Sequence, residues 1–350
     1  MRKTICLFLI LNIWAATVNS QEKRSLTIED FNNWNILKSS VISNDGKIIA
    51  FEQNPQKGDG KLIIRFENGD FDTIPRGCNP AIGPENDFIV FNIKQPEDII
   101  RKAKLAGNDK ELPPDSIGIL TVDSRKITGF PRLKSMKIAE ENVSWIAFTV
   151  TPEKDLKDSV GIKKSKGKDN KAVREDLVLY NIKTADTIFI SSVTEYFYSK
   201  KGTYIFFNKQ EEDSVSVNSF LYRFNTATAV QDLLFSEKGT LKKVVSDDLG
   251  TNYAFLFSKD SVDNKIYSLF SGTADELPDI LIDSYTRGIP VGWSPSVHSE
   301  IYFSANSLKL FFGTAKDPVM IKKDTVPEDE RPKLDIWNWQ DTKLQPQQLI

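Results

Sequence analysis

One pattern occurs six times in the sequence: a short turn of Ser, Asn, Asp and Gly, followed by a run of β-branched and aromatic residues. The turn residues favour tight turns, because Gly and Asn readily adopt positive φ. The apolar run that follows is typical of a strand buried on both faces or nearly so. The six copies are residues 43–51, 83–91, 140–148, 199–207, 246–257 and 294–303.

A second kind of segment lies between these copies. It consists of a strand, a short polar turn and a second strand, with alternating polar and apolar residues. Such a pattern predicts a half-exposed hairpin. The six hairpins are residues 62–70, 117–127, 177–187, 220–227, 265–273 and 308–316.

The two kinds of segment alternate strictly, and each pair recurs after about 40 to 60 residues, the range of a four-stranded propeller blade. A single blade cannot bury both of its faces, so neighbouring blades must stack. We therefore predict an all-β fold, a β-propeller of the seven- or eight-bladed type that is incomplete in this chain. A β-sandwich is the alternative, but six pairs of segments in the same order favour the propeller.

Three segments depart from the repeat. Residues 95–105 carry acids early and bases late, which predicts a helix. Residues 27–30 resemble a capping box ahead of Phe31 and Trp34 and predict a short helix at the start of the mature chain. The mostly basic residues 163–176 predict a solvated loop, since no aromatic residues are interleaved as a nucleic-acid groove would require.

The first 20 residues have the layout of a secretory signal peptide. Arg2 and Lys3 precede an apolar stretch, residues 5–18, and small side chains lie before Gln21. A membrane anchor is the alternative, but a bilayer span needs about 20 apolar residues. We predict cleavage near Ser20, a propeller over residues 21–350, and an exported protein, periplasmic or extracellular, with no membrane attachment after cleavage.

Charge and cysteine content limit the possible partners and cross-links. Lys and Arg number 46 against 48 Asp and Glu, a net charge of −2. This near-balance gives no basic excess for nucleic acid, and we expect no such partner. Once the signal peptide is removed, Cys78 is the only cysteine, so no internal disulfide can form. A lone Cys flanked by Gly77 and Asn79 predicts a small buried apolar side chain.

The nearest approach to a hydrolase nucleophile lies at residues 292–296. A G-x-S-x-G elbow is incomplete there, because the second Gly is missing and Pro295 has no N–H for an oxyanion hole. We interpret Ser294 as part of a blade turn and His298, the only histidine, as an exposed or half-buried loop residue. The spacing leaves a Ser294–His298 pair open, but such a pair also needs an orienting acid and an oxyanion site.

No set of residues meets the requirements of a metal or cofactor site. Zinc sites need more His and Cys ligands than this chain has. Three acidic groups, Asp247 with Asp248, Asp260 with Asp263, and residues 328–330, could supply oxygens to calcium, but none has EF-hand spacing and each fits a solvated turn. No P-loop or G-x-G-x-x-G is present. A glycosidase carboxylate pair stays open, because 48 acids do not single one out. We assign no catalytic, cofactor-binding or metal-binding residue.

Residues 334–350 begin a seventh hairpin, with a turn expected at Asp341 and Thr342. By the pattern another turn and strand should follow, and they do not. We therefore expect incomplete closure, with the last hairpin lacking its inner partner, an open edge of the kind that invites pairing. This predicts a truncated gene product or a subunit that something else completes.

Several segments together resemble the prolyl oligopeptidase (S9) family of serine peptidases, in particular long exported members of Bacteroidetes-like bacteria. The resemblance covers nearly the whole mature chain. Its residues are Phe31-Asn32-Asn33-Trp34, Lys94-x-Pro96, Arg101-x-Ala103-Lys104, Pro114-Asp115-Ser116-Ile117, Asp176-Leu177-Val178-Leu179-Tyr180, Asp324-Thr325-Val326-Pro327, Lys333-Leu334-Asp335-Ile336-Trp337-Asn338-Trp339 and Leu344-Gln345-Pro346-Gln347-Gln348.

The resemblance implies a propeller that caps a C-terminal α/β-hydrolase domain and filters the access of peptides to its Ser, Asp and His. No residue of this chain matches those three, so the resemblance implies a portion that is inactive alone. Its expected partners are peptide substrates, through the full enzyme, and possibly a separate catalytic α/β-hydrolase chain. The alternative hypothesis is a stand-alone protein- or peptide-binding propeller of the cell envelope.

Overall fold

A computed structural model describes ten parts of the chain. They are residues 25–31, 34–107, 112, 114–141, 144–152, 175–212, 217–260, 264–318, 338–343 and 347. The signal-peptide prediction, nearly all of the basic run and most of the seventh hairpin lie outside these residues. Residues 338–343 include a turn in which the Asp341 N–H donates to the Asn338 carbonyl, at 3.0 Å.

The fold is all-β and of the β-propeller type, built from consecutive antiparallel blades. Blades 1 and 2 are separate four-stranded sheets whose strands pair in chain order. Blade 1 comprises β1 (Asn35–Ile42), β2 (Ile48–Pro55), β3 (Lys61–Phe66) and β4 (Phe71–Pro75). Blade 2 comprises β5 (Gly77–Ile82), β6 (Phe88–Ile93), β7 (Ser116–Thr121) and β8 (Lys126–Phe130).

Blades 3 and 4 share one long strand and form a seven-stranded sheet. The first half of β12 (Thr187–Tyr198) pairs with β11 (Glu175–Asn181), and its second half pairs with β13 (Tyr204–Glu212). The outer strand of blade 3 thus continues as the inner strand of blade 4. The remaining strands are β9 (Leu133–Lys137) and β10 (Trp145–Val150) in blade 3, and β14 (Val217–Asn225) and β15 (Gln231–Lys238) in blade 4.

Blade 5 is again a separate four-stranded sheet, whereas blade 6 departs from the pattern. Blade 5 comprises β16 (Thr240–Ser246), β17 (Asn252–Ser258), β18 (Ser268–Thr273) and β19 (Asp279–Ile282). Blade 6 has only short strands, which are β20 (Trp293–Pro295), β21 (Tyr302–Phe303), β22 (Leu310–Phe311) and β23 (Thr314–Lys316). In it β20 pairs with β23 and β21 with β22, so Ser294 lies in a strand and not in the predicted turn.

The six predicted turn-and-strand units are the second strands of the six blades, β2, β6, β10, β13, β17 and β21. The six predicted hairpins overlap the third strands, β3, β7, β11, β14, β18 and β22, but most of the fourth strands begin at or beyond the predicted bounds, and both predicted helices are present. α2 (Ile28–Phe31) begins at Thr27, whose N–H donates to the Asp30 carboxylate at 2.7 Å. α3 (Glu97–Ala106) ends at Gly107 in the left-handed conformation (φ 71°). No helix in the described part of the chain is long and apolar enough to cross a membrane.

Each of four successive blade-to-blade crossings occurs at one residue with positive φ. These residues are Arg76 (61°), Arg132 (65°), Ser192 (61°) and Gly239 (147°). A positive φ bends the chain locally, and at these residues the outer strand of one blade leads directly into the inner strand of the next. Gly239 must be glycine, since an added Cβ would lie 2.3 Å from the Ser258 carbonyl oxygen.

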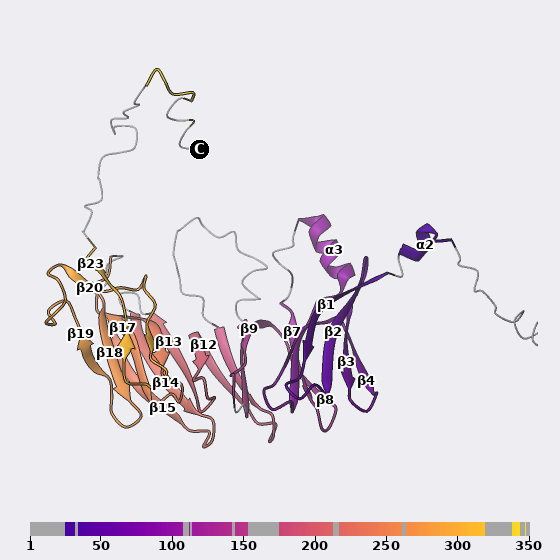
Figure 1. Ribbon diagram of the computed structural model, residues 1–350, viewed down its shortest axis with the longest axis horizontal. Helices are drawn as coiled ribbons and strands as arrows, with labels where there is room; N and C mark the ends of the chain where they lie inside the picture. The colour runs from indigo at the N-terminus through magenta and orange to yellow at the C-terminus, as the bar shows by residue number, and fades with distance from the viewer. Residues whose placement is uncertain are drawn as a thin grey trace, which may run out of the picture.

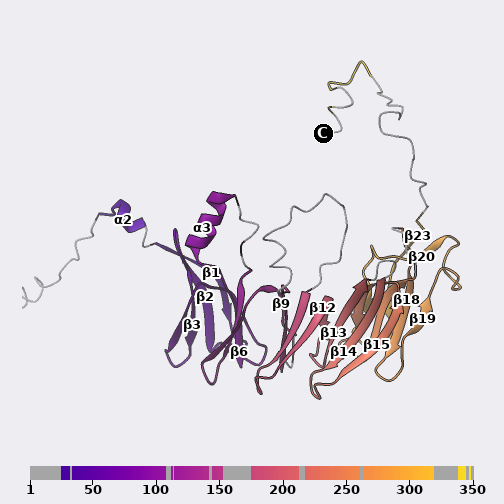
Figure 2. The same cartoon turned by 180° about the vertical axis from the view of Figure 1, so that it is seen from behind.

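The core is a series of apolar layers between neighbouring blades. The layer between blades 4 and 5 is the most aromatic, with Phe235 packed 4.9 Å from both Phe255 and Phe257. Figure 1 shows the blades side by side in a row with blade 1 at one end and blade 6 at the other, and Figure 2 shows the same order from behind. The sheets described do not close into a ring.

One expectation about burial was wrong for blade 1, and also for blade 6, where Tyr302 of the second strand is 54% exposed. The second strand of each blade was expected to be buried on both faces or nearly so, and β10 is buried at all six residues. In β2, however, Ile49 is 42% exposed and Phe51 is half-buried. The cause is position, because no blade covers the outer face of blade 1 among the described residues.

Candidate functional site

A groove with a volume of about 670 Å³ lies where the inner strands of blades 3, 4 and 5 meet the second strand of blade 6. This size falls in the range of small-ligand sites, about 300 to 1,000 Å³. Its lining consists of residues 137–140, 197–200, 244–248 and 301–303. In blades 3, 4 and 5 these are the ends of the inner strands β9, β12 and β16 and the turns that follow them.

The inner strands leave backbone groups free to bind an extended chain. β9 pairs only with β10 and β16 only with β17, and the second half of β12 pairs only with β13 among the described strands. Each therefore presents an edge that pairs with no other described strand, although the Tyr196 carbonyl of β12 accepts from Lys137 Nζ and the Leu241 N–H of β16 donates to Ser219 Oγ. Such edges pair with extended peptides by adding a strand.

Apolar side chains form much of the groove wall, and charged ones stand at its rim. Phe197 contributes a ring that stacks on Phe206 with centroids 5.1 Å apart, and Val244 lies beside it in the same layer. Lys137 donates through Nζ to the Tyr196 carbonyl at 2.9 Å and so links the inner strands of blades 3 and 4. At the rim Lys200 pairs with Asp248 at 3.6 Å. The groove can thus bind apolar side chains and make polar contacts with a main chain.

Two tyrosines next to the groove are structural. The Tyr198 hydroxyl accepts from the Ala147 N–H at 2.6 Å and donates to the Trp145 carbonyl at 2.9 Å. The Tyr196 hydroxyl donates to the Ala147 carbonyl at 3.3 Å. Burial raises the pKa of both phenols, so they stay protonated and anchor the inner strand of blade 4 to blade 3.

Asp247, one of the candidate calcium ligands, is bound within its own turn. Its carboxylate accepts from the Thr251 N–H at 2.8 Å, from the Thr251 hydroxyl at 2.9 Å and from the Asn252 amide at 2.6 Å. Burial acts to raise its pKa, but these hydrogen bonds outweigh burial and lower it. In the part of the chain that the structure describes, no group of three His, Cys, Asp or Glu side chains could hold a metal ion. Asp263 and residues 328–330 lie outside that part.

Ser294 and His298 line one cavity of about 340 Å³ between blade 6 and the segment that leads into β18 of blade 5. Ser294 is buried and His298 is exposed, and the His298 backbone N–H donates to Ser296 Oγ at 3.2 Å. No hydrogen bond joins Ser294 to His298, both of which are described. The described residues around this cavity include no Asp or Glu that could orient the imidazole.

Cys78 lies in the inner strand β5 and is 2% exposed, which confirms the prediction of a small buried side chain. Burial raises the pKa of its thiol to about 11. A thiol with such a pKa is a poor nucleophile near neutral pH.

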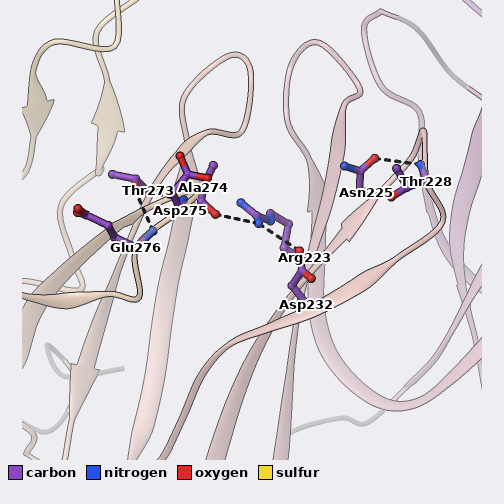
Figure 3. Close-up of polar contacts among 8 residues, drawn as sticks. All are labelled: Arg223, Asn225, Thr228, Asp232, Thr273, Ala274, Asp275 and Glu276. Atoms are coloured by element: carbon purple, nitrogen blue, oxygen red, sulfur yellow. Dashed lines mark hydrogen bonds and ion pairs between the residues drawn. The ribbon is translucent and has the colours of Figure 1, made fainter.

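Arg223 is a buried charge that the sequence analysis did not single out. Its side chain is 8% exposed, and its Nη2 donates to the Asp232 carboxylate at 3.1 Å and to the Ala274 carbonyl at 3.2 Å. Figure 3 shows it between the outer hairpins of blades 4 and 5, where turns capped by Asn225 and Thr273 lie on either side. Its guanidinium also lies 4.7 Å from the Tyr204 ring centroid. Arg223 therefore links blade 4 to blade 5 at a place distant from the groove. The one sequence signal for this role is the presence of an Arg in an otherwise apolar strand.

Comparison with known proteins yields structural likeness only. The sequence matches no protein-family model and no curated protein. The β-propeller domain of the Trilobed protease from Pyrococcus furiosus aligns at 10% identity and a TM-score of 0.39, over 81% of this chain and 80% of that domain. Pyrococcus horikoshii acylaminoacyl peptidase aligns at 10% identity and a TM-score of 0.40, and the match spans 43% of its length. TolB from Acinetobacter baumannii aligns at 13% identity and a TM-score of 0.28, over 70% of this chain and 55% of TolB. At such scores the strand topology remains the evidence for the fold.

Proposed function

We propose that this chain is the non-catalytic, substrate-binding propeller of an exported S9-type serine peptidase, and that its groove receives peptides in extended conformation. The observation that carries the proposal is the groove of blades 3 to 6, where unpaired strand edges lie beside apolar side chains. Extended peptides need both features, since main-chain hydrogen bonds supply affinity and side-chain pockets supply selectivity.

The family assignment rests on the sequence segments that resemble S9 peptidases. In that family a propeller filters peptides before an α/β-hydrolase domain cleaves them. The catalytic partner would therefore be an α/β-hydrolase, on the same polypeptide or on a separate chain. Export rests on the composition of residues 1–20, and the site of action would be the periplasm or the cell exterior.

Peptide binding is tested on the full chain with a library of capped, fluorescently labelled tetra- to hexapeptides, read by fluorescence anisotropy. We expect saturable binding that Ser246→Trp, a substitution in the groove lining, weakens by about tenfold or more, equivalent to about 1.4 kcal/mol. The matched control is Leu105→Trp on the exposed surface of α3, which should leave affinity unchanged. Equal affinities for both variants would place peptide binding elsewhere.

The catalytic half of the proposal has a separate readout. The purified chain should neither hydrolyse peptide p-nitroanilides nor react with a fluorophosphonate probe of activated serines. Covalent labelling above that of a Ser294→Ala variant would overturn the proposal and assign chemistry to the Ser294–His298 cavity.

A stand-alone peptide-binding propeller is the second candidate, since the groove is formed within the described residues of blades 3 to 6 alone. The two candidates differ when an α/β-hydrolase from the same genome is added. Complex formation and accelerated or restricted peptide cleavage support the peptidase propeller, and peptide binding without any such complex supports the stand-alone module.

A further inference from the structure

Each interface between neighbouring blades follows one rule. We call the face of a blade that packs on the preceding blade its back face, and the face that packs on the following blade its front face. The back faces of blades 2, 3 and 4 each bury an Ile-x-Phe pair from the second strand. These pairs are Ile89 and Phe91, Ile146 and Phe148, and Ile205 and Phe207, all 0% or 1% exposed.

Blade 1 carries the same pair at the same place, Ile49 and Phe51, but no described residue covers it. Ile49 is 42% exposed, and its pairing partner on β1, Ile42, is 63% exposed. On the same face Phe51 pairs with Ile63 of β3, and Phe71 of β4 is 66% exposed. Directly paired residues project on the same side of a sheet, so Ile42, Ile49, Phe51 and Ile63 form one apolar surface. Phe71 lies on the same face beyond Arg65, which pairs with both Ile49 and Phe71. Contiguous apolar surfaces of this kind mark interaction sites.

Blade 6 presents the complementary surface at the other end of the row. Its back face, with Ile301 and Phe303, packs on blade 5. Its front face carries Tyr302 and Phe311, which pair across β21 and β22 with rings stacked 5.0 Å apart. They are 54% and 44% exposed. Front faces in this molecule pack on back faces, so the front of blade 6 fits the uncovered back of blade 1.

We infer that these two end faces bind one another between molecules, so that a second copy of this chain associates head to tail with the first. The two faces lie at opposite ends of the row in both views, so one molecule cannot join its own described ends without rearranging the interfaces between its blades (Figures 1 and 2). A second copy supplies both missing surfaces in the geometry that the molecule already uses internally. A contact of front against back is heterologous, and it either closes into a ring or extends as a chain.

Two single substitutions separate this arrangement from any other. Phe71→Asp places a charge on the back face of blade 1, and Phe311→Asp places one on the front face of blade 6. The full-length chain should sediment above monomer mass, with a mass that rises with concentration, and each variant alone should be monomeric. An equimolar mixture of the two should form a dimer and nothing larger, since each molecule retains one intact end.

The control is Leu105→Asp, an exposed position on α3 away from both faces, which should associate like the unmodified chain. Ile49→Asp provides a second block of the back face should Phe71→Asp unfold by circular dichroism. An unmodified chain that stays monomeric at its highest soluble concentration would overturn the inference. So would dimerisation of Phe311→Asp alone, which indicates contact between two back faces, or a mixture that remains monomeric.

Discussion

Blades 1 and 2 carry nearly the same second strand, yet bury it differently. β2 contains Ile49-Ala50-Phe51 and β6 contains Ile89-Val90-Phe91. In β6 both large side chains are fully buried, because the front face of blade 1 covers them. In β2 the Ile is 42% exposed and the Phe is half-buried. The difference teaches that the local pattern determines the strand, whereas the neighbouring blade determines how much each side chain contributes to stability.

The largest effect on stability should come from replacing the phenylalanine of each second strand, Phe91 in β6 and Phe51 in β2, by alanine. Phe91→Ala removes a fully buried ring and should lower the free energy of unfolding by about 3 to 5 kcal/mol. Phe51→Ala should cost about 1 kcal/mol, because much of the ring's surface remains in water. Denaturant unfolding at low protein concentration measures both, and equal losses would contradict the comparison.

The glycine that accommodates Phe91 offers a second contrast. Gly118 pairs with Phe91, and an added Cβ would lie 2.3 Å from the ring. Gly118→Ala should therefore cost about 1 to 3 kcal/mol through overpacking. The equivalent partner of Phe51 is Ile63, whose replacement by Ala should cost about 1 kcal/mol of lost burial. In the double variant Gly118→Ala with Phe91→Leu, the smaller side chain should recover part of the stability lost through Gly118→Ala. If the two changes in free energy of unfolding were strictly additive, a steric clash would not be the cause.

The turns before the second strands should differ in their response to acid. Asp247 in blade 5 is 3% exposed, and its hydrogen bonds lower its pKa below the ordinary 3.8. Its contribution is fully present above pH 3.8 and is lost as pH falls through the lowered pKa. Asp247→Asn should cost about 1 to 3 kcal/mol at neutral pH and flatten the acid limb of the stability curve. Asp45→Asn, in the exposed turn of blade 1, should cost less stability at neutral pH and flatten the acid limb less. Thermal unfolding of both variants between pH 2 and 7 measures the two differences.

The smallest effect concerns the reactivity of Cys78. Its side chain lies on the face of blade 2 that packs on blade 3, since Cys78 pairs with Asn92 and Asn92 with Ile117 of that layer, and burial raises the pKa of its thiol to about 11. A disulfide reagent at neutral pH should leave the native chain unlabelled and label it fully in denaturant. Rapid labelling of the native chain would show that the buried face of β5 opens in solution.

Much of the fold could be predicted from the sequence, because the second strands and outer hairpins have strong local signals. The turn ahead of β2 and the apolar run of β10 are examples. The inner strands were not predicted, because segments such as Asn35–Ile42 lack a clean alternation and several carry bulges, as at Lys38 to Val41. In blade 6 the expected long strands are short: β20 ends at Pro295, which pairs with Thr314 and has no N–H to donate.

The groove could not be predicted either. Its walls come from four segments that lie far apart in the sequence, and the repeated turns that they overlap predict strands and not a site. Arg223 was missed for a related reason, since its partners Asp232 and Ala274 belong to a neighbouring strand and to the next blade. Both features follow from how blades stack, and that information resides in tertiary contacts.

Native-state hydrogen exchange of β2 and β6 tests the central claim most directly. The account holds that two nearly identical local sequences acquire their stability from the blade that covers them, so blade 1 should open at a lower free energy than blade 2. At a concentration where the chain is monomeric, the paired amides of β2 should exchange markedly faster than those of β6. Equal protection of the two strands under those conditions would contradict the account.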